Sequence, residues 1–260
     1  MSSANLERVN GLLNAIMASD PQSDSDRRQL HIKLNSEALC LRESANINGT
    51  DGLIPHVAQC IASNPDPGHH TLGILHLLNA HMQSKHQRDI YALLEVVDKT
   101  AYFNATKQFL MNSPDNLKTK IFSAGQSVHV MYADVCRMFA QTAVDLNACP
   151  EAIEPLARGS RLVANGEAIL TPCHTELIRI CLKSQQIAGV AKNVLDTPIY
   201  SIDPNNTGLQ TKDFLLYYYY GGLAYSSLKE WESAVNFFSQ CINTPADGLS
   251  SIVVEAHKYW

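Results

Sequence analysis

The most restrictive feature of this sequence is a run of aromatic and small residues near its C-terminus. Residues 213–248 read DFLLYYYYGGLAYSSLKEWESAVNFFSQCINTPADG. Two adjacent glycines in a helical pattern each cost roughly 1 kcal/mol in helix propensity relative to alanine. That cost suggests a close approach of two helix backbones, so Gly222 and Ala234 are expected at the contact of a helix pair. Tyr225 and Phe238 are expected to fill the flanking holes.

The spacing of these residues matches the 34-residue tetratricopeptide repeat. Gly221, Cys241 and Pro245 depart from the repeat: the first two replace a leucine and a small residue, and the proline lies one residue early. The spacing still predicts a tetratricopeptide-like helix pair over 215–248. The predicted helix-packing positions are Tyr218, Gly222, Tyr225, Trp231, Ala234 and Phe238.

Four consecutive tyrosines, at 217–220, precede the glycines. At about 100° per residue they point around about 300° of a helix, so they cannot all face one core. The helix is therefore expected to be covered on several sides. Packing between repeats is the favoured interpretation, and a groove for a partner is the alternative. The candidate partner surface consists of Tyr217, Tyr219, Tyr220, Ile252 and Val253.

Apolar residues recur at helical spacing along the rest of the chain. The stripes cover 6–17, 30–41, 52–62, 72–82, 90–97, 128–139 and 177–187. A shorter helix is expected to open at Ile153 or at Pro155, since proline is favourable at the first helical position. Period-two alternation is absent, apart from a few residues near 199–202, so no sheet is predicted.

The fold class is therefore all-α, and repeated helix pairs favour a right-handed α-solenoid over a compact bundle. We expect three parts: N-terminal helices over 1–65, irregular helical repeats over 66–210, and the tetratricopeptide-like pair over 211–260 with the first helix of a next repeat. In that last helix the stripe of 249–256 runs on to Trp260 without a capping residue. It is expected to leave apolar surface through which the chain self-associates.

Charge and composition exclude several classes of partner. The chain has 20 Lys and Arg against 25 Asp and Glu, and its longest basic stretch is Arg27-Arg28, which argues against nucleic acid. No apolar run approaches the roughly 18 to 20 residues that span a bilayer, and the first residues lack a signal-peptide pattern, so no membrane is expected. Seven cysteines without framework spacing are interpreted as reduced, buried thiols of an intracellular protein.

Two blocks carry a resemblance to a known family. KDFLLYYYYGGLAYSSLKEW (212–231) and NTPADGLSSIVVEAHKYW (243–260) resemble the third-subunit family of the COP-nine (COP9) signalosome. That family has an aromatic-rich YYYGG helix, a K-x-[FW] turn, a TPA turn and a LEAYKKY-type helix. Weaker similarity covers 155–159, 174–182 and 70–73, whereas 1–65 match nothing. His257 and Trp260 depart from the family pattern.

The resemblance implies a non-catalytic scaffold subunit in the cytoplasm and nucleus. The complex removes a ubiquitin-like modifier from cullins (deneddylation) and so regulates cullin-RING ubiquitin ligases. The implied partners are the other signalosome subunits, and cullin-RING ligases are a further candidate. Family members continue into a winged-helix PCI domain that is absent from these 260 residues, so the chain is expected to be a fragment.

Two alternatives stay open. A scaffold subunit of the proteasome lid or of the translation initiation complex would use the same plan of repeats. A free-standing tetratricopeptide adaptor would capture peptide tails in a basic groove, but the helices of 215–245 carry only Lys229.

The sequence predicts no catalytic, cofactor-binding or metal-binding residue. A deneddylating metalloprotease needs a His-x-His pair, which is absent. His76, His81 and His86 are five residues apart and do not share a helix face. Cys173-His174 are adjacent and poorly placed for thiolate activation, so a buried cysteine beside a surface histidine is expected. Phosphate-binding loops and Gly-x-Ser-x-Gly are also missing.

Overall fold

The computed structural model of this protein describes residues 3–18, 21–45, 52–63, 70–83, 99–117, 122–164, 167–245 and 250–260. Over these residues the fold is all-α, as predicted. The only strand-like feature in the described ranges is an isolated parallel bridge between Ile169 and Ser201, which falls in the weakly alternating segment near 199–202. None of the described helices is long and apolar enough to cross a membrane.

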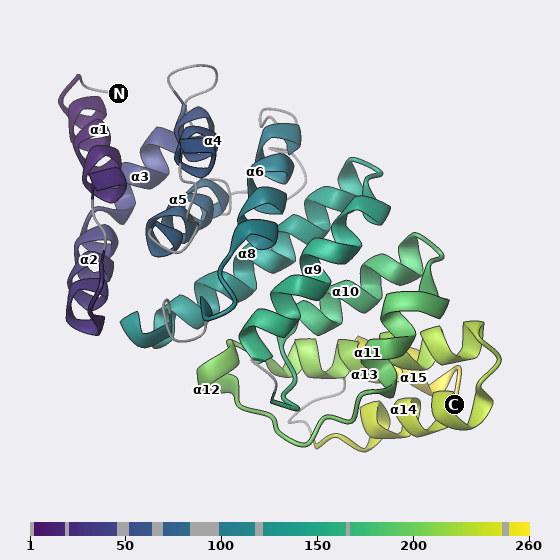
Figure 1. Ribbon diagram of the computed structural model, residues 1–260. Helices are drawn as coiled ribbons and strands as arrows, with labels where there is room; N and C mark the ends of the chain where they lie inside the picture. Colours follow the sequence, from purple (N-terminus) through teal and green to yellow (C-terminus); the bar gives the residue numbers. More distant parts are fainter. Residues whose placement is uncertain are drawn as a thin grey trace.

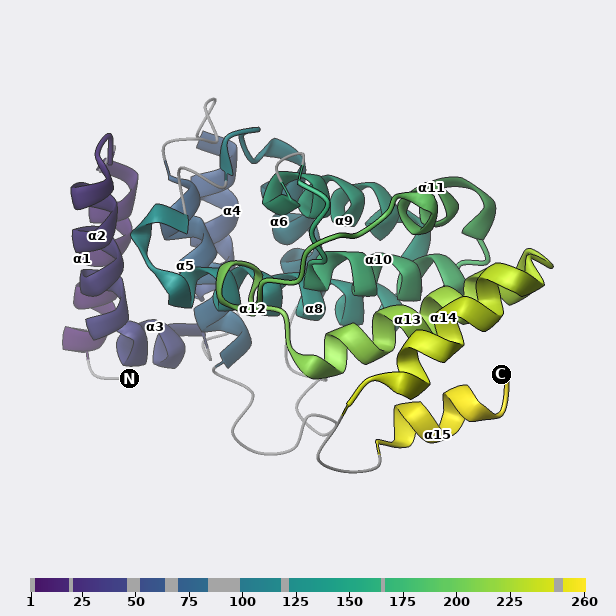
Figure 2. The same ribbon diagram turned by 90° about the horizontal axis from the view of Figure 1, so that it is seen from below.

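The helices follow one another in a row, and the two ends of the chain lie at opposite ends of the molecule (Figure 1). In chain order the elements are α1 (Ser3–Ala18), α2 (Asp24–Ser36), α3 (Ala38–Ala45), α4 (Leu53–Ser63), α5 (Thr71–Gln83), α6 (Lys99–Asn112), the 3-10 turn η1 (Phe122–Ala124), α8 (Gln126–Asp145), α9 (Cys149–Ala164), α10 (Pro172–Lys183), the π-turn η2 (Ile187–Ala191), α11 (Lys192–Asp196), α12 (Pro204–Thr207), α13 (Thr211–Ser227), α14 (Trp231–Asn243) and α15 (Ser251–His257). Figure 2 shows the same row from below, with α13, α14 and α15 at its C-terminal end.

The stripe over 30–41 belongs to two helices, so the expectation of a single second helix is wrong. Helix α2 begins at a capping box, in which the hydroxyl of Ser23 accepts from the backbone N–H of Asp26 at 3.1 Å. It ends at Glu37, whose φ of −98° and ψ of 7° turn the chain into α3. Because one apolar stripe continues across this turn, its period does not reveal the break.

Helix α9 begins at Cys149, earlier than the expected start at Ile153 or Pro155. Asn147, with a φ of 54°, ends the preceding turn, and Pro150 occupies the first turn of α9, where its missing N–H has no carbonyl to bond. Pro155 therefore lies inside the helix. It stays there as a buried residue, although an internal proline removes one helical hydrogen bond.

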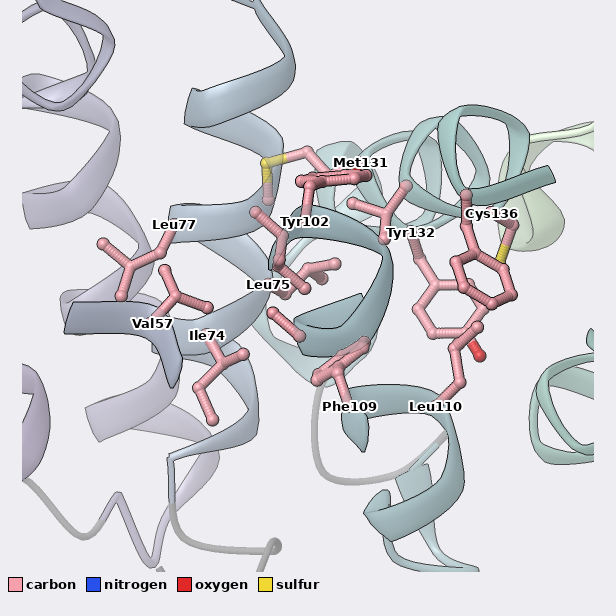
Figure 3. Packing of buried hydrophobic residues seen from close by; sticks show 14 of the residues in the cluster. Val57, Ile74, Leu75, Leu77, Tyr102, Phe109, Leu110, Met131, Tyr132 and Cys136 are labelled. Carbon is pink, nitrogen blue, oxygen red and sulfur yellow. The ribbon is translucent and has the colours of Figure 1, made fainter. Parts of the chain in front are cut away.

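Buried apolar side chains form two clusters. The larger runs from Val9 on α1 to Ala191 and takes in α4, α5, α6, α8 and α9. Figure 3 shows part of this cluster, in which side chains such as Leu75, Tyr102 and Tyr132 from different helices pack together. The smaller cluster runs from Leu170 to Ala256 and is built mainly on α13, α14 and α15. The candidate site lies on this second cluster.

The larger cluster continues across residue 65, since side chains of α1 to α4 and of α5 to α9 belong to it. The division of the chain at 65 and 210 stays a prediction. The stripe expected over 90–97 lies outside the described residues.

Candidate interaction surface

Helices α13 and α14 form a hairpin whose turn passes through Lys229, in the left-handed region with a φ of 63°. The two glycines of α13 face α14. A Cβ at Gly222 would lie 2.6 Å from the ring of Phe238, and one at Gly221 would lie 2.4 Å from the ring of Phe237. Such distances are shorter than real carbon contacts, so both positions require glycine unless the rings move.

The hairpin brings most of the predicted helix-packing residues together. Gly222, Tyr225, Ala234 and Phe238 are buried at the contact, and Tyr218 is half-buried. Trp231 departs from the expectation, because its side chain is 63% exposed. It is the first residue of α14, where its ring lies outside the contact that Ala234 makes one turn later.

The four tyrosines surround α13, as their angular spread requires. Tyr217 is buried with its ring 5.9 Å from that of Phe237, and the ring of Tyr218 lies 5.3 Å from the same phenylalanine. The ring of Tyr219 faces α15, 6.4 Å from that of Tyr259. Tyr220 is half-buried beside Tyr219.

The expected partner surface needs two corrections. Tyr217 is covered by α14, and Val253 of α15 is buried in the smaller cluster, so neither is available to a partner. Tyr219, Tyr220 and Ile252 are half-buried. Sequence spacing alone could not show this, because α15 folds back onto α13 and α14 instead of continuing outward as an open stripe.

An exposed apolar row follows the outer side of the hairpin. Trp231 and Val235 lie one turn apart on α14, and Ser239 is the next residue on the same helix face. The indole N–H of Trp260 donates to the hydroxyl of Ser239 at 2.8 Å, which places a second exposed indole on this row. We call Trp231, Val235 and Trp260 the α14–α15 surface.

A cluster of ion pairs fixes α13 to α8, in the middle of the row of helices. The guanidinium of Arg137 on α8 donates to the carboxylate of Asp213 at 2.6 Å, to that of Asp134 at 2.6 Å and to the carbonyl of Gly208 at 3.2 Å. Asp213 also accepts from the backbone N–H of Gln210, and so caps α13. Burial opposes the charge of Arg137, but the two carboxylates outweigh it and raise its pKa.

A second set of polar contacts holds α11 against the hairpin. The hydroxyl of Tyr225 donates to the carboxylate of Asp196 at 2.9 Å. Lys192 pairs with Asp196 at 3.0 Å and with Glu230 at 2.7 Å. We call these four residues the α11 clasp, and it joins α11 to both ends of the turn between α13 and α14.

Among the described residues, the histidines and cysteines considered for chemistry pack in the core or cap a helix. In the described ranges, no group of three or more His, Cys, Asp or Glu side chains could hold a metal ion. His81 stacks on Tyr102 with ring centroids 5.5 Å apart, whereas His86 lies outside the described residues. The thiol of Cys173 is buried 2.9 Å from that of Cys136, whose pKa is raised by burial.

His174 is not the surface histidine that the sequence suggested. It is half-buried, and its Nδ1 accepts from the backbone N–H of Thr171 at 3.1 Å, which caps α10. Burial lowers its pKa to about 4, and a neutral ring is what this acceptor role needs.

A buried pair of histidines joins α2 to α5. Nδ1 of His31 lies 2.9 Å from Nε2 of His76, and Nε2 of His31 lies 2.8 Å from the hydroxyl of Ser127 on α8. One ring nitrogen of the close pair must donate and the other accept, so the two rings cannot both be imidazolium. Burial, with a smaller effect of His31, lowers the pKa of His76 to about 3.

This pair predicts a loss of stability in acid. Because the folded-state pKa of His76 lies below 6.5, the unfolded chain binds a proton that the folded chain refuses. His76 should lower the free energy of unfolding by up to about 1.4 kcal/mol per pH unit from pH 6.5 down toward 3, and His174, whose pKa is also lowered by burial, adds to this slope. Urea denaturation at pH 7, 6, 5 and 4 measures this slope. His76→Gln should make the slope shallower by the contribution of His76, whereas His257→Gln on the exposed end of α15 should leave the slope unchanged. Equal slopes in both variants would contradict the assignment.

Sequence reasoning missed Arg137 and the histidine pair. Gln210-x-x-Asp213 ahead of an apolar run is a signal for the start of α13. No local signal connects Asp213 to Arg137, because the two are 76 residues apart.

Comparison with known proteins is consistent with this geometry. A family model described as COP9 signalosome complex subunit 3, N-terminal helical repeats, matches residues 50–260. A Drosophila melanogaster protein named COP9 signalosome complex subunit 3 is 28% identical over 212 residues, which cover 74% of this chain and 43% of the relative. A Dictyostelium discoideum protein of the same name is 35% identical over 89 residues, 34% of this chain and 21% of the relative. The matches thus span less than half the length of these relatives.

Proposed function

The chain belongs to the family of N-terminal helical repeats of COP9 signalosome complex subunit 3, and from this membership we propose that it is a non-catalytic scaffold subunit of the COP9 signalosome. The observation that carries the proposal is the family match over 50–260, which includes the whole of the α13–α14 hairpin. The partners are the other subunits of the complex. Through them the chain supports the removal of the ubiquitin-like modifier from cullins, and so the regulation of cullin-RING ligases, in the cytoplasm and nucleus.

A row of helix pairs suits this role. Each pair exposes an outer face, so such an array offers a long surface to several neighbours at once. The α14–α15 surface is the best candidate for one of these contacts. Its two exposed indoles are of the residue type that most often dominates binding energy at protein interfaces.

The free-standing adaptor is less well supported. An adaptor would need basic residues in its peptide-binding groove, and Lys229 is the only one in 215–245. Lys229 lies in the turn between α13 and α14 and not on an inner helix face. The residues that face into the hairpin are aromatic or small. A groove for acidic peptide tails would need several basic side chains there.

Affinity capture tests the proposal. The tagged chain is expressed in cells, and co-purifying proteins are identified and quantified by mass spectrometry. We expect enrichment of other COP9 signalosome subunits. Trp231→Ser combined with Val235→Ser should lower their recovery about tenfold or more if the α14–α15 surface is a contact.

A matched variant controls for loss of apolar surface in general. Ile32→Ser combined with Leu39→Ser removes two exposed side chains from α2 and α3, at the other end of the row. Equal loss in both variants would contradict a specific role for the α14–α15 surface. Enrichment of proteasome-lid or initiation-factor subunits in place of signalosome subunits would overturn the proposed function itself.

A further inference from the structure

The sequence contains four Ser-Pro or Thr-Pro dipeptides, at Ser113, Thr171, Thr197 and Thr244. A serine or threonine followed by proline is the acceptor motif of proline-directed protein kinases. The four sites differ clearly in their exposure to solvent. Ser113 and Thr171 are buried, Thr244 is half-buried, and Thr197 is exposed.

The chain leaves α11 at Thr197 and is extended from this residue onward. Thr197 directly follows α11, with a φ of −78° and a ψ of 118°, as expected for a residue before proline. Pro198 is exposed, and the side chain of Tyr200 is 82% exposed. Further along, the segment is held by backbone hydrogen bonds from Tyr200 and Ser201 to the carbonyl of Ala168, at 2.9 and 3.1 Å. The acceptor is thus presented on an exposed segment fixed at both ends.

The hydroxyl of Thr197 also has a structural role. It donates to the carbonyl of Asn193 at 2.8 Å and so satisfies one of the last carbonyl groups of α11. Its neighbour in the chain, Asp196, is part of the α11 clasp and accepts from Tyr225 on α13. A change at Thr197 therefore acts on the end of α11, one residue from the carboxylate that bonds the hairpin.

We propose that Thr197 is a phosphorylation site for a proline-directed kinase, and that the phosphate loosens the α11 clasp. In the reaction the γ-phosphoryl group of ATP is transferred to Oγ1 of Thr197, ADP leaves, and the hydroxyl proton goes to the catalytic base of the kinase. The ester oxygen carries no proton, so its hydrogen bond to Asn193 is lost. The phosphate adds a charge of about −1.5 to −2 beside the carboxylate of Asp196, and it competes with Glu230 for Lys192.

Phosphorylation of the folded chain tests the site. The whole chain is incubated with a purified proline-directed kinase and ATP, and the modified residues are mapped by mass spectrometry. We expect one phosphate, on Thr197, and none on the buried Ser113 and Thr171. Thr197→Ala and Pro198→Ala should abolish it, whereas Thr244→Ala should leave it unchanged.

The urea-unfolded and then diluted chain, with all four sites accessible, provides the control for kinase competence. It should be modified at several sites. If the folded chain gives the same pattern as the unfolded chain, or if phosphate persists in Thr197→Ala, the structural selection of Thr197 is wrong. Lack of phosphate on folded Thr197 under conditions that modify the unfolded chain would also overturn it.

Hydrogen exchange tests the consequence. In the phosphorylated chain, backbone amides of 192–197 should exchange about fivefold faster, the change expected from loss of one hydrogen bond. Tyr225→Phe, which removes the hydroxyl from the clasp without a phosphate, should have a similar effect. If exchange is unchanged in the phosphorylated chain and raised in Tyr225→Phe, the phosphate does not act on the clasp.

Discussion

Replacement of Arg137 by leucine is expected to lower the free energy of unfolding by about 3 kcal/mol. The substitution leaves the carboxylate of Asp213, whose side chain is only 6% exposed, without its guanidinium partner. Leaving one member of a buried ion pair unpaired typically costs about 3 to 5 kcal/mol. The lower end applies here, since Asp213 retains the backbone N–H of Gln210 and Arg137 is 21% exposed.

Urea denaturation followed by circular dichroism measures this loss. Arg161→Leu is the matched control, because Arg161 pairs with Glu154 through side chains that are both well exposed. That variant should change the free energy of unfolding by no more than about 0.5 kcal/mol. Adding Asp213→Asn to Arg137→Leu should recover part of the stability, because the uncompensated charge is removed. Equal denaturation midpoints for the two arginine variants would show that the Arg137 pair does not hold α13 in place.

Replacement of Gly222 by leucine is expected to lower the free energy of unfolding by about 1 to 3 kcal/mol. The first added carbon already falls 2.6 Å from the ring of Phe238, so the ring must move or α14 must separate from α13. Both outcomes weaken the packing around Tyr225 and Ala234. Even the shorter Gly222→Ala should destabilise, although alanine is the better helix former.

Gly11 provides the comparison. It lies inside α1 with no atom within 4 Å of an added Cβ, so Gly11→Ala should raise the free energy of unfolding by up to about 1 kcal/mol. We expect the free energy of unfolding to rise in Gly11→Ala and to fall in Gly222→Ala, as measured by thermal and urea denaturation. Such opposite changes would show that close packing, and not helix propensity, decides the effect at Gly222. A midpoint unchanged in Gly222→Leu would show that Gly222 is not at a helix contact.

The sequence predicted the helices and the glycine contact of the hairpin correctly, because both depend on residues that are close together in the chain. The 3.6-residue stripes identify helices because each helix must bury one face, and that requirement is written within a few turns of chain. The glycines and Ala234 identify the closest contact of the hairpin for the same reason. The failures occur where a distant neighbour decides the result. Tyr217 and Trp231 differ in exposure because of how α13 and α14 meet, and Val253 is buried because α15 turns back.

Arg137 illustrates the other limit. Its partner Asp134 is three positions away on the same helix, but Gly208 and Asp213 are 71 and 76 positions away, so a local window shows only the pair with Asp134. The break between α2 and α3 and the early start of α9 were missed because turns at Glu37 and Asn147 interrupt the backbone without interrupting the apolar pattern.

The position of the two indoles gives the molecule an optical property. Trp231 and Trp260 are the only tryptophans of the chain, and both are exposed on one side of the C-terminal hairpin. Tryptophan emission from the native chain therefore originates entirely at the α14–α15 surface, from rings in contact with water. A protein that covers this surface shifts the emission to shorter wavelength and shields it from a soluble quencher, while events at α1 to α6 leave it unchanged.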